Sequence, residues 1–223
     1  MKRDPLITGQ VYHIVSRSIS NFKIFNSQKK YERGLNLIQY FQIANPPEKF
    51  SNLLRLNEVK KSGFQKYFDS TLKGQKKRVK IIAYCLMPTH VHLLLKQLED
   101  HGISNYISNF LNSFSRYFNI RHKRKGPLWE SRFKSILVDD DSYLLHLTRY
   151  IHLNPATARL VSKPEKWQFS SYREYLGDNS INLANYRGLV EVVPKSYKKF
   201  VNDRIDYQRK LTQIKNLILD QTI

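Results

Sequence analysis

The sequence has few of the features that mark several large classes of protein. Its 223 residues include one cysteine, Cys85, so the chain cannot form an internal disulfide, and this usage is typical of a reducing compartment. Spanning a bilayer takes about 20 consecutive apolar residues, and no such run occurs. The start, Met1-Lys2-Arg3-Asp4-Pro5, lacks the apolar segment of a signal peptide. We therefore expect a soluble cytoplasmic protein with no membrane partner.

Acidic residues are also scarce. There are 18 Asp and Glu against 38 Lys and Arg, which gives a formal net charge of +20. A field of that size favours a polyanion, and nucleic acid is the commonest one, although charge alone leaves membrane surfaces and ribosomes open. The hydrophobic fraction of 41% is that of a globular protein, and the length suits one domain with additions.

Two histidines open the second of two adjacent predicted strands. An apolar run over residues 79–83 leads to a turn at Pro88, and a second apolar run follows. Side chains alternate along a strand, so His90 and His92 point to the same side. Two such imidazoles form half of a metal site. Solvated or hydrogen-bonded pairs of this spacing are common, so the pair alone leaves metal binding open.

The region before this pair predicts one strand, one helix and an insertion. Residues 10–17 are typical of a first strand, whose His13 either approaches the metal site or has a structural role. A helix follows Ser27 and stops before Asn45. Residues 48–78 suggest one or two short helices and end in a basic stretch, which is either a solvated loop or a phosphate-contacting edge.

A second basic stretch follows a helix predicted from residue 103 to residue 119. Residues 116–134 contain seven basic side chains and one acidic side chain, interleaved with Trp129 and Phe133. Such a pattern favours a nucleic-acid surface, although a basic loop with buried aromatic rings is the alternative. The side chains that we predict to bind nucleic acid are Arg17, Arg116, Arg121, Lys123, Arg124, Lys125, Trp129, Arg132 and Lys134.

The next helix carries a tyrosine and an asparagine on one face. Its acidic start, Asp139-Asp140-Asp141, favours a helix N-terminus over a metal site. Because Pro155 disfavours helix at the preceding residue, we expect this helix to end at Asn154 and a short one to begin at Pro155. Tyr150 and Asn154 are four residues apart, so they project from the same face. Beyond residue 180, Leu189–Val193 could form a short strand, and residues 195–223 are predicted to be mainly helical.

In this order, four segments resemble the single-tyrosine HUH transposases, and most closely the REP-associated tyrosine transposases. The segments are Val11-Tyr12-His13-Ile14-Val15-Ser16-Arg17, Met87-Pro88-Thr89-His90-Val91-His92-Leu93-Leu94-Leu95, Gly126-Pro127-Leu128-Trp129-Glu130-Ser131-Arg132-Phe133-Lys134-Ser135 and Arg149-Tyr150-Ile151-His152-Leu153-Asn154-Pro155. The resemblance covers roughly residues 5–176 and implies an α/β (α+β) fold, with an RRM-like or ferredoxin-like antiparallel sheet flanked by helices. We accordingly expect a transposase domain over 1–178, with the insertion 48–78, and a helical C-terminal extension over 179–223.

The resemblance also implies a set of site residues. His90, His92 and Asn154 would bind Mg²⁺ or Mn²⁺, and Tyr150 would be the nucleophile. Enzymes of this kind cut single-stranded DNA at hairpins formed by palindromic repeats, and they leave a 5′-phosphotyrosine and a free 3′-hydroxyl. The expected setting is bacterial and nucleoid-associated. Thr89 stands where many relatives carry Asn or Asp, at a position that is not a ligand.

Several alternatives stay open at this stage. Tyr117, in a basic helix end, is a second candidate nucleophile, and His146 or His152 could contact DNA. The chain could be a domesticated DNA-binding protein that no longer cuts, or an RNA-binding protein that uses its sheet as a platform. The sequence does not distinguish a monomer from a homodimer.

Overall fold

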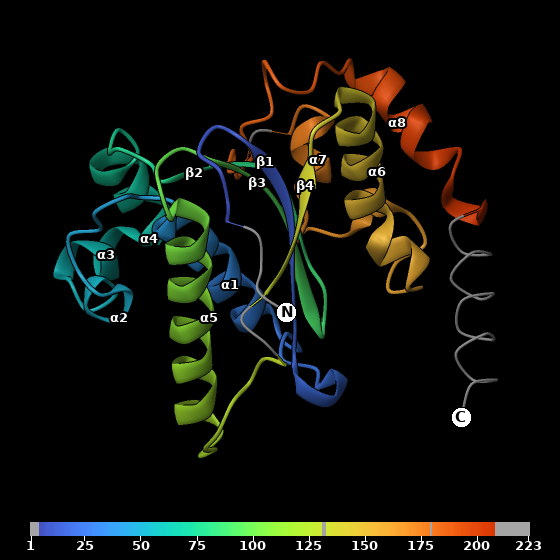
Figure 1. The fold of residues 1–223 in the computed structure, drawn as a ribbon. Helices are drawn as coiled ribbons and strands as arrows, with labels where there is room; N and C mark the ends of the chain where they lie inside the picture. The colour runs from blue at the N-terminus through green and yellow to red at the C-terminus, as the bar shows by residue number, and fades with distance from the viewer. Residues whose placement is uncertain (1–4, 131–132, 179, 208–223) are drawn as a thin grey trace.

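The computed structural model describes residues 5–130, 133–178 and 180–207 (Figure 1). The strands are β1 (Val11–Arg17), β2 (Val79–Leu86), β3 (His90–Gln97) and β4 (Lys134–Val138). The α-helices are α1 (Gln28–Phe41), α2 (Phe50–Leu53), α3 (Asn57–Ser62), α4 (Phe64–Tyr67), α5 (Gly102–Arg121), α6 (Asp141–Thr157), α7 (Tyr172–Tyr175) and α8 (Pro194–Asn202). Short 3₁₀ helices span Ile19–Asn21 and Pro164–Lys166, and a π-helical turn spans Phe68–Leu72.

The four strands form one antiparallel sheet in the order β2-β3-β1-β4. Helices α1 and α5 cover one face of this sheet, while α6 and α7 lie over the other (Figure 1). The predicted antiparallel sheet flanked by helices is confirmed. Because helices cover both faces of the sheet, the apolar side chains of the two inner strands, β1 and β3, are buried on either side.

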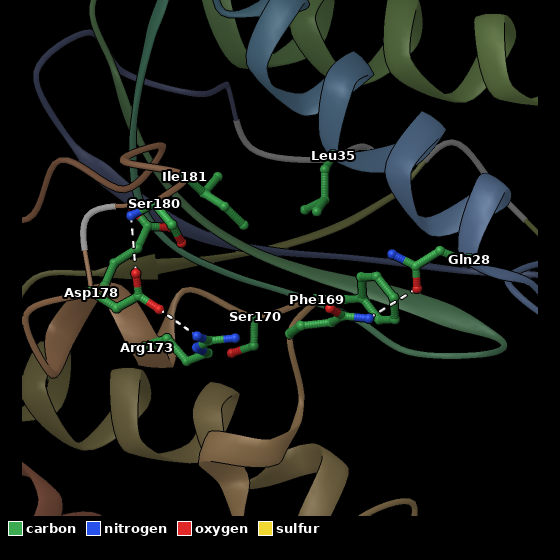
Figure 2. A pocket seen from close by; sticks show the side chains of 10 residues that line it. Gln28, Leu35, Phe169, Ser170, Arg173, Asp178, Ser180 and Ile181 are labelled. Carbon is green, nitrogen blue, oxygen red and sulfur yellow. Dashed lines mark hydrogen bonds and ion pairs between the residues drawn. The ribbon is translucent and has the colours of Figure 1, made fainter. Parts of the chain in front are cut away.

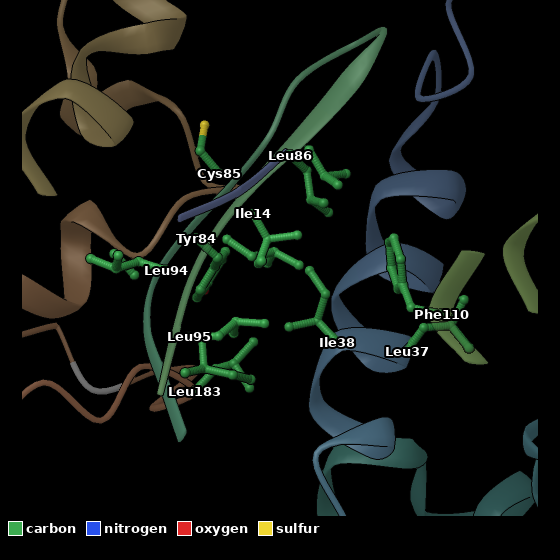
Figure 3. Close-up of a cluster of buried hydrophobic side chains, with 14 of the residues drawn as sticks. Ile14, Leu37, Ile38, Tyr84, Cys85, Leu86, Leu94, Leu95, Phe110 and Leu183 are labelled. Atoms are coloured by element: carbon green, nitrogen blue, oxygen red, sulfur yellow. The ribbon is translucent and has the colours of Figure 1, made fainter. Parts of the chain in front are cut away.

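The main core lies between the sheet and helices α1 and α5. Ile14 of β1 faces Ile38 of α1 there, while Leu37 of α1 lies beside Phe110 of α5 (Figure 3). All four side chains are fully buried. Burial of this kind contributes about 1.5–3 kcal/mol for each large apolar side chain, so this layer fixes the sheet against the helices.

The insertion folds as a chain of short helices on the α1 side of the sheet. It contains α2, α3, α4 and the π-helical turn, which is more than the one or two helices predicted. Phe50 anchors it, because its ring lies 5.2 Å from that of Tyr40 in α1 and 5.5 Å from that of Phe64 in α4.

Helix α6 begins as predicted but ends later. The Asp140 side chain accepts a hydrogen bond from the Tyr143 backbone N–H at 2.7 Å, which confirms the acidic cap. The expected end at Asn154 is wrong, since α6 continues through Pro155 to Thr157. Pro155 has no N–H for the Ile151 carbonyl, and the Asn154 side-chain amide instead donates to that carbonyl at 3.5 Å and to the Tyr150 carbonyl at 3.0 Å.

The segment after residue 180 packs on the rest of the protein. The short strand expected at Leu189–Val193 is wrong, because these residues form a turn and irregular structure. Tyr197 of α8 is buried, and its hydroxyl donates to Thr148 and bonds to His152 of α6 at 2.9 and 2.7 Å. Of the helix predicted over 195–223, residues 208–223 lie outside the described residues. Across the described ranges, every helix is too short or too polar to cross a bilayer.

Candidate active site

The register of the two inner strands gathers polar side chains on the α6 face of the sheet. His92 lies opposite Val15, and Arg17 lies opposite His90. Because side chains alternate along each strand, His13, Arg17, His90 and His92 all share this face. Tyr150 reaches the same place from α6, with its ring centroid 5.7 Å from that of His92 and 6.2 Å from that of His13. The structure thus brings together His90, His92 and Tyr150 as predicted.

Each histidine of the pair uses its Nδ1 atom to bind a neighbour. The Nδ1 atom of His90 lies 2.9 Å from the Thr89 hydroxyl, and the Nδ1 atom of His92 lies 3.1 Å from Nε2 of His13. In the part of the chain that the structure describes, no hydrogen bond engages the Nε2 atom of His90 or His92. A histidine that binds a metal through one nitrogen usually has the other held by such a partner, so this arrangement prepares both Nε2 atoms as ligands.

All three imidazoles favour the neutral form. Burial lowers the pKa of His13 to about 4 and, with a smaller contribution from the Arg17 charge, lowers the pKa of His90 to about 4. Burial also holds the pKa of His92 well below its usual value, and the neighbouring His90, His13 and Arg17 add to this effect. Only a neutral imidazole has a free lone pair, so the site favours the protonation state that a cation needs.

Tyr150 is accessible, with 41% of its surface exposed. Burial of the rest raises the pKa of its phenol, while the positive charge of Arg17 and the Asn154 amide act in the opposite direction. At neutral pH the phenol is therefore protonated, and Arg17 lies where it can stabilise negative charge that develops on the oxygen.

The donor set fits a divalent cation in part. Two neutral imidazoles suit Mn²⁺ and related ions, and an amide oxygen suits Mg²⁺ as well. Asn154 directs its NH₂ group to its own helix, so its Oδ1 atom is not used by those two hydrogen bonds. Within the described ranges, no three His, Cys, Asp or Glu side chains are arranged to hold a metal. Metal binding by His90, His92 and Asn154 stays a prediction.

The predicted nucleic-acid side chains separate into different surfaces. Arg17 belongs to the cluster above, and Lys134 is exposed on the edge strand β4. Arg116 and Arg121 extend from α5, on the other side of the sheet. Lys123 and Lys125 are exposed in the loop after α5. Arg132 lies outside the described residues.

Two of the predicted side chains support the loop that carries them. Arg124 donates to the Asn119 side chain at 3.0 Å and to the Pro127 carbonyl at 2.7 Å. Trp129 is only 8% exposed and donates from its indole nitrogen to the Leu111 carbonyl at 3.2 Å. Its ring packs on Phe110 and Phe114, so the expectation that it stacks on a base is corrected to a packing role.

The rival residues lie elsewhere. Tyr117 belongs to α5, on the face of the sheet opposite the histidines, where its ring lies 4.9 Å from the Arg33 guanidinium. His152 is fully buried between Tyr197 and Ser171, so it cannot contact DNA. His146 is exposed and bonds to Arg149 at 2.6 Å.

A small pocket beside α1 and α7 is separate from this cluster (Figure 2). It has a volume of about 170 Å³, and none of its lining residues is a predicted site residue. Its Arg173 guanidinium pairs with the Asp178 carboxylate at 2.6 Å, and Gln168 donates to Gln28 at 2.9 Å. Since these polar groups satisfy one another, the pocket presents no open charge to a ligand.

Sequence reasoning gave His13 too little weight. One histidine on an apolar strand is usually structural, and only the pairing of β1 with β3 shows that it bonds to His92. The available signal was the alternation of β1, which puts His13 and Arg17 on one face.

Comparison with known proteins finds similar chains among the transposases. A family model described as IS200-like transposase matches residues 55–154, which include His90, His92, Tyr150 and Asn154. A Haemophilus influenzae protein described as a REP-associated tyrosine transposase is 29% identical over 101 residues, in a match covering 41% of this chain and 57% of that protein. The chain is related to the IS200-like, REP-associated tyrosine transposases. The resemblance stated from the sequence motifs is confirmed.

One solved structure agrees on the fold. A REP-associated tyrosine transposase bound to a REP hairpin matches with a TM-score of 0.50 at 14% identity, over 86% of this chain and 98% of that one. A transposase from Deinococcus radiodurans R1 matches with a TM-score of 0.33 at 16% identity, over 68% and 95% of the two chains. The first match supports the transposase fold. The chain spans little more than half the length of the Haemophilus relative, and its own β1, with His13 and Arg17, lies outside the segment matched by the IS200-like model.

Proposed function

We propose that this chain is a metal-dependent transposase that cleaves and rejoins single-stranded DNA at hairpins or repeats through a 5′-phosphotyrosine. One observation carries the proposal. The ring of an accessible tyrosine, Tyr150, lies 5.7 Å from the ring of the buried His92, and no hydrogen bond among the described residues uses the Nε2 atom of His92 or His90. The transposase relationship supports the same conclusion.

Strand cleavage would be a transesterification at phosphorus. The Tyr150 oxygen forms a bond to phosphorus, the bond to the 3′ oxygen breaks, and the phenolic proton ends on the released 3′-hydroxyl. The DNA strand after the break keeps its 5′-phosphate on the tyrosine. A 3′-hydroxyl reverses the step, and because phosphate ester bonds are exchanged one for one, no ATP is consumed.

The chain's own groups supply the setting for this step. Arg17 is beside both Tyr150 and the histidines, so it favours the phenolate and the phosphate together. His13 holds His92 in place through their hydrogen bond. A divalent cation bound by His90, His92 and Asn154 would polarise a non-bridging phosphate oxygen and offset the charge of the transition state.

The proposed substrate follows from charge and from the relatives. The net charge of +20 favours a polyanion, and one solved relative is described as bound to a REP hairpin. We infer that the protein acts on nucleoid DNA in the bacterial cytoplasm, as a monomer or a homodimer.

An adduct assay tests the proposal. Labelled single-stranded oligonucleotides with hairpins from the protein's own genomic flanks are incubated with Mn²⁺ or with EDTA and separated on a denaturing gel. We expect an adduct that requires Mn²⁺ and disappears in Tyr150→Phe. Tyr143→Phe is the matched control, because Tyr143 lies on the same helix and is also 41% exposed.

The other outcomes are equally informative. An adduct that persists in Tyr150→Phe moves the nucleophile elsewhere and refutes the assignment. Tight binding of DNA without an adduct on any flank would instead favour a domesticated, non-cleaving DNA-binding protein.

A further inference from the structure

A basic groove lies on the side of the sheet opposite Tyr150. It has a volume of about 580 Å³ and runs between α5, α1 and the start of the insertion. Its charged lining consists of five cations and no carboxylate. These cations are Arg33 of α1, Lys49 and Arg55 of the insertion, and Arg116 and Arg121 of α5.

Ion pairs among the described residues do not neutralise the positive charge of the groove. None of the ion pairs between described residues includes one of the five cations. The two carboxylates adjacent to these cations in sequence, Glu32 and Glu48, accept hydrogen bonds from Gln28 at 3.0 Å and from Asn52 at 3.3 Å. Lys49, Arg55, Arg116 and Arg121 are exposed. Like charges gathered in one hollow raise the local concentration of anions, because their fields add there.

Arg33 is held at the base of the groove by two aromatic rings. Its guanidinium carbon lies 4.5 Å from the centre of the Phe50 ring and 4.9 Å from that of Tyr117. Rings contact a guanidinium over its flat faces, whereas its N–H donors lie in the plane, so stacking leaves the donors unused. The Nε atom of Arg33 is buried and has no hydrogen-bond partner in the described structure. A planar donor fork of this kind matches a phosphate group.

The insertion forms one wall of this groove. Lys49 and Arg55 flank α2, and Phe50 of the same helix both anchors the insertion to Tyr40 and stacks on Arg33. The insertion therefore places two cations opposite the two that α5 provides. The groove is separated from Tyr150 by the whole sheet, because α1 and α5 cover one face and α6 the other (Figure 1).

We propose that this groove is a second DNA site, which binds the sugar-phosphate backbone of the substrate away from the point of cleavage. The inference rests on the proposed function for its choice of DNA. This proposal gives the insertion a role, since its cations would bind phosphates of the same strand as Arg116 and Arg121. Such contacts add affinity without reading sequence.

The test compares two double variants that remove the same charge. The groove variant carries Lys49→Gln and Arg55→Gln. The control variant carries Lys60→Gln and Lys61→Gln, at exposed lysines of α3 outside the groove. Binding of a labelled DNA hairpin with a long single-stranded flank is measured by fluorescence anisotropy in EDTA, over roughly 50 to 200 mM salt. Thermal unfolding confirms that each variant is folded.

We expect the groove variant to raise Kd by about tenfold and to reduce the salt dependence, d log K/d log[salt], by about 1.5 in magnitude, as loss of two phosphate contacts predicts. The control should bind like the wild type. Equal Kd values for both variants would overturn the inference, as would tighter, groove-dependent binding of an RNA hairpin of the same sequence.

The adduct assay separates this inference from the proposed function. An adduct in the wild type with no groove effect on binding refutes the groove alone. A groove effect on DNA binding without any adduct refutes cleavage and leaves the groove as a DNA site.

Discussion

Replacing His13 tests whether the hydrogen bond that it makes prepares His92 for a metal. For His92 to offer its Nε2 lone pair, its proton must lie on Nδ1 and point at Nε2 of His13, 3.1 Å away. His13→Leu removes the hydrogen-bond acceptor and fills the same space with an apolar side chain of similar size. His13→Gln is the conservative variant, because its terminal amide oxygen can reach the position of the imidazole Nε2 atom.

The size of the effect follows from burial. His13 and His92 are 6% and 5% exposed, so water does not replace the lost partner readily. A buried donor left unsatisfied costs about 1–3 kcal/mol. His92 can avoid that cost by moving its proton to Nε2, which blocks the nitrogen that would bind the metal. Loss of a partner of this kind lowers metal affinity by about 10–100-fold. We expect a loss in that range for His13→Leu and a smaller one for His13→Gln.

The assay measures Mn²⁺ affinity directly. Free Mn²⁺ is titrated by its electron paramagnetic resonance signal in the presence of each variant, without DNA, and urea unfolding in EDTA reports stability separately. Adduct formation should be slow in His13→Leu at low Mn²⁺ and should recover at high Mn²⁺. Wild-type Mn²⁺ affinity in His13→Leu, or equal losses in the Leu and Gln variants, would refute the reasoning.

Two further predictions concern stability. Burial lowers the pKa of His13 and His90 from 6.5 to about 4, and that of His152 to about 3. Below about pH 6.5 the unfolded state therefore binds more protons than the folded state, which destabilises the fold. We expect the urea concentration at the unfolding midpoint, measured in EDTA, to decrease as the pH is lowered from about 7 to about 4. The fall should be smaller in His13→Leu, and an identical fall would contradict the burial of that imidazole. Gly102→Ala should lower the free energy of unfolding by about 1–3 kcal/mol, because its Cβ would clash with the Arg78 carbonyl oxygen. Gly74→Ala, with open space around it, is the control, and equal urea midpoints for the two variants would count against the clash.

Features set by local geometry could be predicted from the sequence. The alternation of a strand put His90 and His92 on one side, and the helical repeat put Tyr150 and Asn154 on one face. The Asp140 cap is also local, since its side chain reaches a backbone N–H only three residues away. In each case the partners are close along the chain, so the period of the element decides the outcome.

Features set by contacts between distant parts of the chain could not be predicted from the sequence. His13 bonds to His92 only because β1 pairs with β3, which no local pattern specifies. Pro155 stays inside α6 because the Asn154 side chain donates to carbonyls of the preceding turn. Trp129 is buried because α5 offers its Leu111 carbonyl and a row of phenylalanines. The predicted DNA-binding residues likewise lie on different surfaces, because α5, with Arg116 and Arg121, covers the face of the sheet opposite the histidines.

The gathering of three imidazoles in one cluster, with His13 and His92 buried and His90 half-buried, is itself an argument for function. Placing a polar group in the protein interior costs free energy unless its hydrogen bonds are satisfied, and apolar side chains would fill the same space at lower cost. The described structure satisfies one nitrogen of His90 and one of His92, and it leaves each Nε2 atom unused beside an accessible tyrosine. Neither Nε2 atom is among the fully buried, unpartnered atoms of the described structure, so both stay accessible to a ligand. Those two atoms favour a ligand that binds both, and a metal ion beside Tyr150 is the ligand whose chemistry fits.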